Sequence, residues 1–386
     1  MGQRRFAWPV LLLAGAVHAA GAPAPPPEAV IATLPFASSE EANRVMVDLA
    51  PEGSRPFVMM LDTGASASVI TPGMARELGV RVRKLKDTPY RRATRLGREL
   101  QFWVDTQSSE TASRTGWEYG LLGGEFLDDY VLEIDFPGRM VRFLDPKRYQ
   151  VPEQIDAADE RVVALQRSAT RVSLPIRVNG HGLVVMLDTG APGTGVISGS
   201  AAREAGIDLA GLGDFGENGS VLGPVQVSLY EEPSFELACI ALGPVPLLVA
   251  PKGWYNQGAG NDSMIGYDVL APFVIRIDYA RKRLWLKRMR SEPIRFYDAD
   301  YGLAKRTGAF MSPVRGGYDV WEVTAGSPAA KLGVRAGDVI VSSESAKAPP
   351  PDDVLRSILE GKELHVARKQ GELLVDTALP EQPPSE

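Results

Sequence analysis

The sequence predicts a mainly β protein built from two similar halves, followed by a small module of mixed α and β structure. Two observations predict the paired halves. Val58–Ala65 (VMMLDTGA) returns 126 residues later as Val184–Ala191 (VVMLDTGA), with seven of eight positions identical. Residues 121–136 align without gaps on residues 264–279, with five of sixteen positions identical. Two copies of a long repeat indicate an internally duplicated unit rather than an array of many repeats.

Each copy of the repeat is expected to form a strand, a turn and a second strand that ends at an aspartate. Before Asp62, apolar residues alternate along residues 45–49 and a Pro-Glu-Gly-Ser turn follows. Before Asp188, they alternate along residues 172–178 and an Asn-Gly turn follows. Alternation with a period of two, interrupted by turn residues, is typical of β-hairpins. A short apolar pair and a helical segment are expected after each aspartate.

The pattern changes from about residue 298 onward. Residues 320–340 predict a strand, a loop, a short helix, a glycine turn and a second strand. Residues 354–359 predict another helix, and residues 364–375 predict a closing pair of strands. The segment from Pro380 is rich in proline and acidic residues and is expected to be disordered.

The first 22 residues predict a secretory signal peptide. Two arginines precede an apolar stretch, Phe6–Val17, and small residues follow up to Ala22. Cleavage is expected after Ala19 or Ala20. The apolar stretch is too short to span a bilayer, which needs about 20 residues, so no stable membrane anchor is expected. The chain is therefore predicted to be exported, with a periplasmic or secreted location.

Charge and residue counts exclude several classes of function. Without the two arginines of the leader, 40 basic residues face 48 acidic ones, which argues against nucleic acid as a partner. Outside the leader only His181 and His365 remain, so a His-rich zinc site is excluded and a Ser-His-Asp triad lacks a base. We expect no metal and no cofactor. Cys239 is the only cysteine, which excludes an internal disulfide and predicts a small buried apolar side chain.

The two halves resemble the pepsin and retropepsin superfamily of aspartic proteases. Each half carries an apolar strand, an Asp-Thr-Gly-Ala phrase and a later apolar-apolar-Gly, and the resemblance covers residues ~40 to ~290. Residues 300–380 resemble a PDZ domain of the bacterial protease-associated type, through the phrase GSPAAKLGVRAGDVI. The resemblance implies duplicated retropepsin-like β-barrel halves plus a small α+β PDZ-like domain. The expected segments are 1–22 for the signal peptide, 23–150 for the first half, 151–292 for the second half, 298–380 for the PDZ-like domain and 381–386 for the tail.

The resemblance makes Asp62 and Asp188 the catalytic pair. Two carboxyl groups about 3 Å apart cannot both ionise, so they share one proton. The ionised acid would act as general base on a bound water, and the protonated acid would polarise the scissile carbonyl. The sequence leaves open which aspartate starts protonated. One chain supplies both acids, so a monomer would hold the complete pair.

Supporting residues are expected around the two acids. The glycine after each Asp-Thr permits close approach of the backbone, so that N–H groups can donate to the carboxylates. The resemblance implies that the two threonines cross-link the loops, that a serine bonds a carboxylate oxygen, and that a later glycine in each half lies beneath the loop. These residues are Thr63, Gly64, Ser66, Gly123, Thr189, Gly190 and Gly266.

The two halves depart from the family pattern in different ways. Pro192 stands where the second serine would be and cannot donate a hydrogen bond, which leaves Thr194 as a substitute. The first flap region, residues 82–120, is basic and shows no clear glycine-tipped hairpin. Its counterpart contains Gly216–Gly219 and a Gly-Pro pair after it, which suit a mobile flap. We therefore expect an asymmetric enzyme with one dominant flap.

The resemblance to PDZ domains implies a groove that captures an extended peptide by strand addition. Backbone amides near Tyr301, Gly302 and Leu303 would hold the carboxylate of a C-terminal peptide ligand; the alternative is a module that only caps the fold. The expected function is an exported aspartic endopeptidase acting on a peptide or protein substrate, with the periplasm favoured by the PDZ resemblance. The alternative is a non-catalytic peptide-binding or scaffold protein that uses the PDZ-like module and a decayed cleft.

Overall fold

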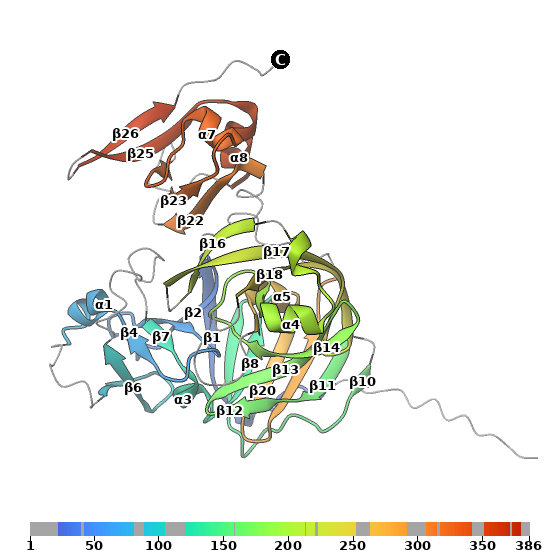
Figure 1. The fold of residues 1–386 in the computed structure, drawn as a ribbon. Coiled ribbons are helices and arrows are strands. Elements are labelled where there is room, and N and C mark those ends of the chain that lie inside the picture. The colour runs from blue at the N-terminus through green and yellow to red at the C-terminus, as the bar shows by residue number, and fades with distance from the viewer. Residues whose placement is uncertain are drawn as a thin grey trace, which may run out of the picture.

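The computed structural model arranges the chain into three β-sheets connected by short helices (Figure 1). The predicted mainly β class is confirmed, because the longest helix of the described residues has ten residues. The structure describes residues 22–39, 42–80, 89–104, 120–157, 159–212, 214–220, 223–251, 263–291, 306–314, 317–341, 351–370 and 373–379.

The order of the strands across each sheet differs from their order along the chain. From one edge to the other, the first sheet contains β10 (Asp156–Ala157), β11 (Glu160–Ala164), β21 (Arg283–Arg288), β20 (Phe273–Asp278), β8 (Val131–Asp135), β9 (Met140–Leu144), β1 (Val30–Ser39), β2 (Ala42–Asp48), β3 (Val58–Leu61), β7 (Gly120–Leu122), β4 (Val69–Ile70), β6 (Glu99–Val104) and β5 (Tyr90–Ala93). The second contains β12 (Gln166–Ser168), β13 (Arg171–Val178), β14 (His181–Leu187), β19 (Met264–Ile265), β15 (Gly195–Ser198), β18 (Ile240–Ala250), β17 (Gly223–Leu237) and β16 (Asp214–Ser220). The third contains β22 (Ala309–Val314), β23 (Gly317–Val323), β24 (Val339–Val341), β25 (Leu364–Gln370) and β26 (Leu373–Leu379).

Short helices connect these strands. They are η1 (Pro27–Ala29), α1 (Pro72–Glu77), α3 (Gly124–Leu127), α4 (Gly199–Glu204), η2 (Leu209–Gly211), α5 (Tyr267–Leu270), α7 (Pro328–Leu332) and α8 (Pro351–Glu360). Hydroxyl side chains start three of them, since Thr71, Ser198 and Ser327 each accept a backbone N–H of the first turn. None of the described helices is long and apolar enough to cross a membrane.

The same strand pairing surrounds both Asp-Thr-Gly loops. β3 pairs in parallel with β7 and antiparallel with β2, and it ends at Leu61. β14 pairs in parallel with β19 and antiparallel with β13, and it ends at Leu187. The last three residues of each strand are buried, as expected of apolar strands with neighbours on both edges. Each aspartate therefore follows the end of a rigid, buried strand.

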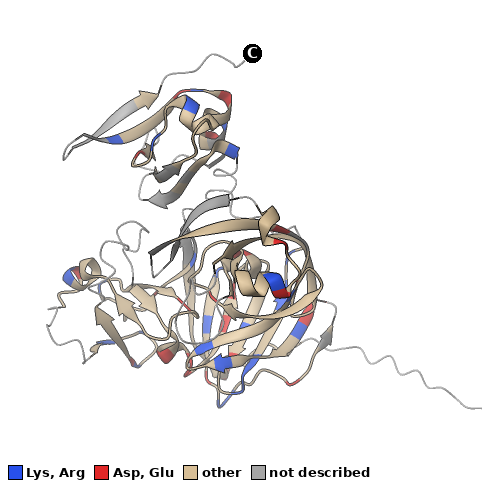
Figure 2. Cartoon of the chain, viewed as in Figure 1, with Lys and Arg blue, Asp and Glu red and all other residues tan. Residues whose placement is uncertain are grey.

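β8 of the first half and β20 of the second half are neighbours in the first sheet, and their pairing joins the two halves. They pair antiparallel from Val131↔Asp278 to Asp135↔Val274. At the middle of this ladder Glu133 lies opposite Arg276, and the two buried side chains form an ion pair of 2.5 Å. Arg276 also stacks on the ring of Trp285, with its guanidinium carbon 4.1 Å from the ring centroid. Acidic and basic residues thus share the strands of this sheet (Figure 2).

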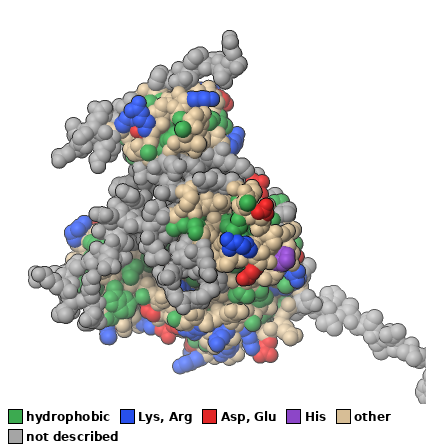
Figure 3. All heavy atoms as spheres, viewed as in Figure 1, with side chains coloured by type: hydrophobic (Ala, Val, Ile, Leu, Met, Phe, Trp, Pro, Cys, Tyr) green, Lys and Arg blue, Asp and Glu red, His purple; other side chains and the backbone are tan. Residues whose placement is uncertain are grey.

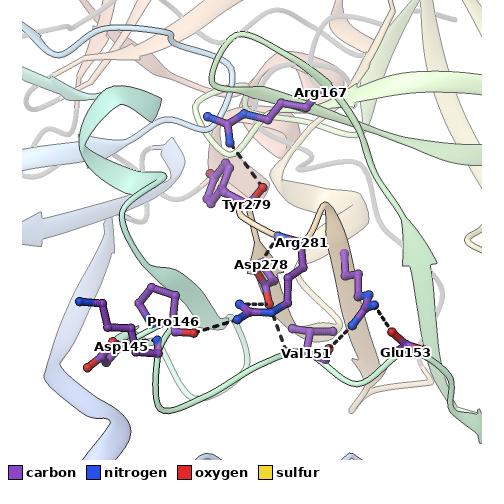
Figure 4. Close-up of polar contacts among 10 residues, drawn as sticks. Asp145, Pro146, Val151, Glu153, Arg167, Asp278, Tyr279 and Arg281 are labelled. Carbon is purple, nitrogen blue, oxygen red and sulfur yellow. Dashed lines mark hydrogen bonds and ion pairs between the residues drawn. The ribbon is translucent and has the colours of Figure 1, made fainter.

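A buried aspartate fastens the segment that connects the halves (Figure 4). Asp278 accepts the backbone N–H of Val151 at 3.3 Å and that of Arg281 at 3.0 Å. The Arg281 guanidinium in turn donates to the carbonyl of Pro146 at 3.2 Å. The chain is therefore held against β20 at the point where it passes into the second half.

The C-terminal sheet has its own hydrophobic cluster. Its thirteen buried members lie between Ala309 and Leu379, whereas the largest cluster runs from Leu34 to Leu286 and contains residues of both halves. Arg368 pairs with the buried carboxylate of Asp338 at 2.6 Å within the C-terminal sheet. The sheet lies apart from the other two in Figure 1.

The prediction that Cys239 is buried is wrong. The residue is exposed and lies in the turn between β17 and β18, with a φ of 66°. Both turn residues have positive φ, and of the two Ala238 is buried whereas Cys239 is exposed, so the position in the turn outweighs the apolar character of the thiol. On the face drawn in Figure 3, hydrophobic, acidic and basic side chains are interspersed, in keeping with the modest net charge.

Candidate active site

Asp62 and Asp188 lie at matching positions after β3 and β14, and both are nearly buried. The two residues are 8% and 7% exposed. Oδ1 of Asp62 accepts the N–H groups of Gly64 and Ala65 at 2.9 and 2.8 Å. Oδ1 of Asp188 accepts those of Gly190 and Ala191 at 2.9 and 3.2 Å. Each loop therefore holds its own carboxyl group in place with two backbone donors.

The two threonines link the loops reciprocally. The Thr63 hydroxyl donates to the carbonyl of Leu187 at 2.7 Å, and the Thr189 hydroxyl donates to the carbonyl of Leu61 at 2.7 Å. Each hydroxyl also accepts the backbone N–H of the other threonine, at 3.1 and 3.2 Å. Both threonines are completely buried. Four hydrogen bonds thus fix the position of one loop relative to the other.

The glycines of the loops lie directly against the opposite carboxyl group. A Cβ atom added to Gly64 would lie 2.5 Å from Cγ of Asp188, and one added to Gly190 would lie 2.6 Å from Cγ of Asp62. No side chain fits at either position, since real Cβ contacts are longer. The two carboxyl groups approach within hydrogen-bonding reach of each other across these glycines.

This proximity changes the acidity of both carboxyl groups. Burial raises the pKa of Asp62, and the N–H groups of Ala65 and Gly64 together with the charge of Arg44 oppose that rise. Burial and then the neighbouring charge of Asp62 raise the pKa of Asp188 well above its ordinary value. Two acids in one desolvated site favour a shared proton over two negative charges.

In each half, a later segment that contains a glycine accepts a hydrogen bond from the start of the Asp-Thr-Gly loop. The N–H of Asp62 donates to the carbonyl of Leu122 at 3.0 Å, and that of Asp188 donates to the carbonyl of Ile265 at 3.1 Å. The next residues, Gly123 and Gly266, have no room for a side chain, because an added Cβ would lie 2.5 and 2.6 Å from backbone atoms of the loops.

The contacts described for Ser66 and Thr194 differ from the expected ones. The described contact of Ser66 is made by its carbonyl, which accepts the hydroxyl of Thr170 at 3.3 Å. Thr194 was the expected substitute for a donor at Pro192, but its hydroxyl donates to the carbonyl of Pro246. Pro192 itself is exposed. Thr194 therefore stabilises the second loop through the backbone of β18.

The structure describes a long hairpin in the second half. β16 and β17 remain paired out to Gly219↔Pro224 and Ser220↔Gly223. The expectation that residues 82–120 form no glycine-tipped hairpin is wrong, because β5 and β6 form one with Gly97 at a φ of 77°. That hairpin corresponds to β17 and β18, since β6 pairs in parallel with β4 as β18 does with β15. Residues 81–88 and 105–119 of the first flap region lie outside the described residues.

Sequence reasoning missed Arg44 and Thr170. Extending the register Met46↔Met60 places Arg44 opposite Asp62, and its positive charge lowers the pKa of that acid. Counting back from the turn between the two strands could have found it. Thr170 belongs to the second half but contacts Ser66 in the first, and only the folded chain shows this contact.

The remaining site predictions concern the C-terminal module and metals. Tyr301, Gly302 and Leu303 lie outside the described residues. Among the residues that the structure describes, no group of three or more His, Cys, Asp or Glu side chains is placed to hold a metal ion.

Comparison with known proteins finds similarity in the segments that carry the two Asp-Thr-Gly loops. Residues 45–101 and 174–269 match the model of an aspartyl protease family. The curated proteins contain no match to the chain. Among solved structures, a retropepsin-like aspartic protease from Rickettsia conorii aligns with 22% identity and a TM-score of 0.27, over 33% of this chain and 90% of that one. The family match includes both Asp-Thr-Gly loops and supports an aspartic protease type of function.

Proposed function

We propose that the chain is an exported aspartic endopeptidase that hydrolyses peptide bonds with a water activated by Asp62 and Asp188. One observation carries the proposal. The two buried acids come from separate halves, and the reciprocal bonds of Thr63 and Thr189 hold them within hydrogen-bonding reach. A protein that only binds peptides has no need for two desolvated acids that share a proton.

The two acids take different roles in this proposal. Asp188 keeps the shared proton, because the nearby charge of Arg44 favours the ionised form of Asp62, and it donates a hydrogen bond to the scissile carbonyl. Asp62 is the ionised partner, favoured by the charge of Arg44, and accepts a proton from the attacking water. The water oxygen then bonds to the carbonyl carbon, and Asp188 gives its proton to the carbonyl oxygen. The proton on Asp62 passes to the leaving nitrogen, the C–N bond breaks as the carbonyl re-forms, and Asp188 recovers its proton from the new hydroxyl group.

The substrate in this proposal is an extended peptide bound between the halves. Strand-like hydrogen bonds suit such a ligand, and the hairpin of β16 and β17 offers an edge to cover it. The export of the chain and a peptide-binding role of its C-terminal module belong to the same proposal. They rest on the leader pattern of Phe6–Val17 and on the GSPAAKLGVRAGDVI phrase.

Peptide cleavage by the purified protein tests the proposal. We would measure the rate from pH 3 to 8 for the wild type, Asp62→Asn and Asp188→Asn, with Asp159→Asn as a control at an exposed position. We expect each dyad variant to lose about 10²- to 10⁴-fold in rate. Wild-type activity should fall as pH rises through the raised pKa of Asp188, because the shared proton is then lost.

Two outcomes would contradict the proposal. Activity that survives in either dyad variant would assign the cleavage to another mechanism. A folded wild type that cleaves none of a diverse peptide library at any pH would favour the non-catalytic peptide-binding protein instead.

A further inference from the structure

A buried carboxylate binds the backbone nitrogen of Ala22. The N–H of Ala22 donates to Oε2 of Glu160 at 2.8 Å, although 138 positions separate the two residues. Glu160 is 5% exposed. The start of β11 thus provides an anionic contact for a nitrogen atom far away in sequence.

Several donors converge on the carboxylate of Glu160. Oε1 accepts the ammonium of Lys287 at 2.9 Å, and Oε2 also accepts the indole N–H of Trp285 at 3.1 Å. The side chain of Ala22 packs against the hydrophobic cluster that contains Trp285. The next carbonyl, that of Pro23, accepts the buried guanidinium of Arg276 at 3.1 Å. Side chains on β11, β20 and β21 therefore hold two consecutive residues.

The negative charge of Glu160 is compensated by one described ion pair. Burial alone would raise the pKa of Glu160, but the donors from Ala22, Lys287 and Trp285 outweigh it, and the pKa lies below its ordinary value. Lys287 is its one described ion-pair partner, and that side chain is 43% exposed. A buried carboxylate is stabilised more by an adjacent cation than by a neutral amide.

The sequence around Ala22 also suits cleavage directly before it. A leader peptidase requires small residues three positions and one position before the cut. Ala19 and Gly21 occupy these positions for a cut before Ala22.

We propose that Glu160 is the receptor for a new amino terminus, created when a leader peptidase cleaves the bond between Gly21 and Ala22. The amide is hydrolysed by one water: the carbonyl carbon of Gly21 gains the hydroxyl, and the nitrogen of Ala22 gains the hydrogen and takes a proton from solvent. The resulting α-ammonium keeps the contact with Oε2 and turns a neutral hydrogen bond into an ion pair. The cut lies one or two residues beyond the sites after Ala19 and Ala20.

The amino terminus of the exported protein gives the first test. The full chain with its leader would be expressed in a Gram-negative host, and the intact mass of the periplasmic form would be measured. We expect a chain that begins at Ala22. A chain that begins at Ala20, at Gly21 or elsewhere would overturn the assignment of the cut.

A stability cycle tests the receptor. Three mature forms would be compared: one beginning at Ala22, one beginning at Ala20, and the first form with an acetylated amino group. Each would be prepared with Glu160 intact and as Glu160→Gln. We expect Glu160→Gln to raise the unfolding equilibrium constant about tenfold more in the free Ala22 form than in the other two, because only that form carries the charge at Oε2.

Glu153→Gln serves as the matched control. Glu153 is 81% exposed and pairs with Arg283, so its replacement should affect the three forms equally. An equal effect of Glu160→Gln in all three forms would show that Ala22 contributes only a backbone hydrogen bond and would overturn the proposal.

Discussion

At the scale of single residues, the two loops are built so that each depends on the other. The carbonyl groups that accept the threonine hydroxyls end the strands β3 and β14, so each loop is fixed to the strand that carries the opposite acid. The glycines that face the acids leave space for nothing else. Small changes in either loop should therefore affect both acids.

Replacing Thr63 by Val should destabilise the protein by about 2 to 6 kcal/mol. Valine has nearly the same shape but leaves the buried carbonyl of Leu187 and the N–H of Thr189 without partners, at roughly 1–3 kcal/mol each. Urea denaturation would measure the loss. Thr63→Ser keeps the hydroxyl and should lose clearly less; equal losses in the two variants would show that the hydroxyl contacts are unimportant.

Gly64→Ala should abolish peptide cleavage while Gly182→Ala leaves it unchanged. The added methyl group of the first variant would overlap the carboxyl group of Asp188, whereas Gly182 has no atom within 4 Å of an added Cβ. Cleavage rates of the folded variants, with folding checked by circular dichroism, would decide the matter. Full activity in Gly64→Ala would mean that the two carboxyl groups are farther apart.

Asp188→Asn should be more stable than the wild type at neutral pH. The raised pKa of Asp188 means that the folded protein holds a proton which the unfolded chain releases above its ordinary value of 3.8. This stabilisation is present at low pH and is lost as pH rises through the raised pKa. Asparagine never ionises, so the urea midpoints should coincide near pH 3.5 and diverge towards pH 7. A constant difference over this range would contradict the raised pKa.

At the scale of elements, the ladder of β8 and β20 joins the two halves within one chain. Its centre is polar, since Glu133 and Arg276 are buried opposite each other. The Arg276 guanidinium also lies on the ring of Trp285 and donates to Tyr149 at 2.7 Å. The buried ion pair between Glu133 and Arg276 therefore favours this register of β8 against β20.

Arg276→Met should destabilise the protein by about 3 kcal/mol, because removal of one partner leaves a buried carboxylate with less compensation. Arg91→Met breaks an ion pair whose two side chains are about 60% exposed, and it should cost less than about 1 kcal/mol. Urea denaturation of both variants gives the comparison. A double variant with Glu133→Gln should regain part of the loss; if it loses more, the carboxylate has other essential partners.

Sequence periodicity predicted most helices and strands but few of the contacts between them. The apolar runs before Asp62 and Asp188 predict the strands, because burial on both edges requires such runs. The contact of Thr170 with Ser66 could not be predicted, since it joins segments 104 positions apart. The turn at Cys239 was misjudged because residue type alone does not report backbone φ.

At the scale of the whole molecule, two of the hydrophobic clusters among the described residues lie in different parts of the chain: the first and largest is shared by both halves, and the second is confined to the C-terminal sheet. The repeated Asp-Thr-Gly phrase predicts two matching halves whose acids meet, and a cluster shared by both halves agrees with this prediction. The sequence did not predict the hydrogen bond that the Thr194 hydroxyl donates to the carbonyl of Pro246. That contact depends on how closely β18 approaches the loop, which no pattern of residue types encodes.

The two clusters should unfold independently. Leu247→Ala should destabilise the first by about 2–5 kcal/mol and leave the second unchanged, and Leu332→Ala should do the reverse. Hydrogen exchange followed by mass spectrometry would report each region separately. Faster exchange of β25 in Leu247→Ala, or of β14 in Leu332→Ala, would show that the clusters unfold as one unit.

The order of the acids along the chain has a consequence for the timing of activity. Asp62 emerges early in synthesis, but its partner follows 126 residues later, and the supporting strand β19 and the ladder strand β20 come later still. A ribosome must therefore make more than two thirds of the polypeptide before the two loops can meet. Until then the newborn chain lacks the second acid of the pair, so under the proposed function it cannot yet cleave peptides.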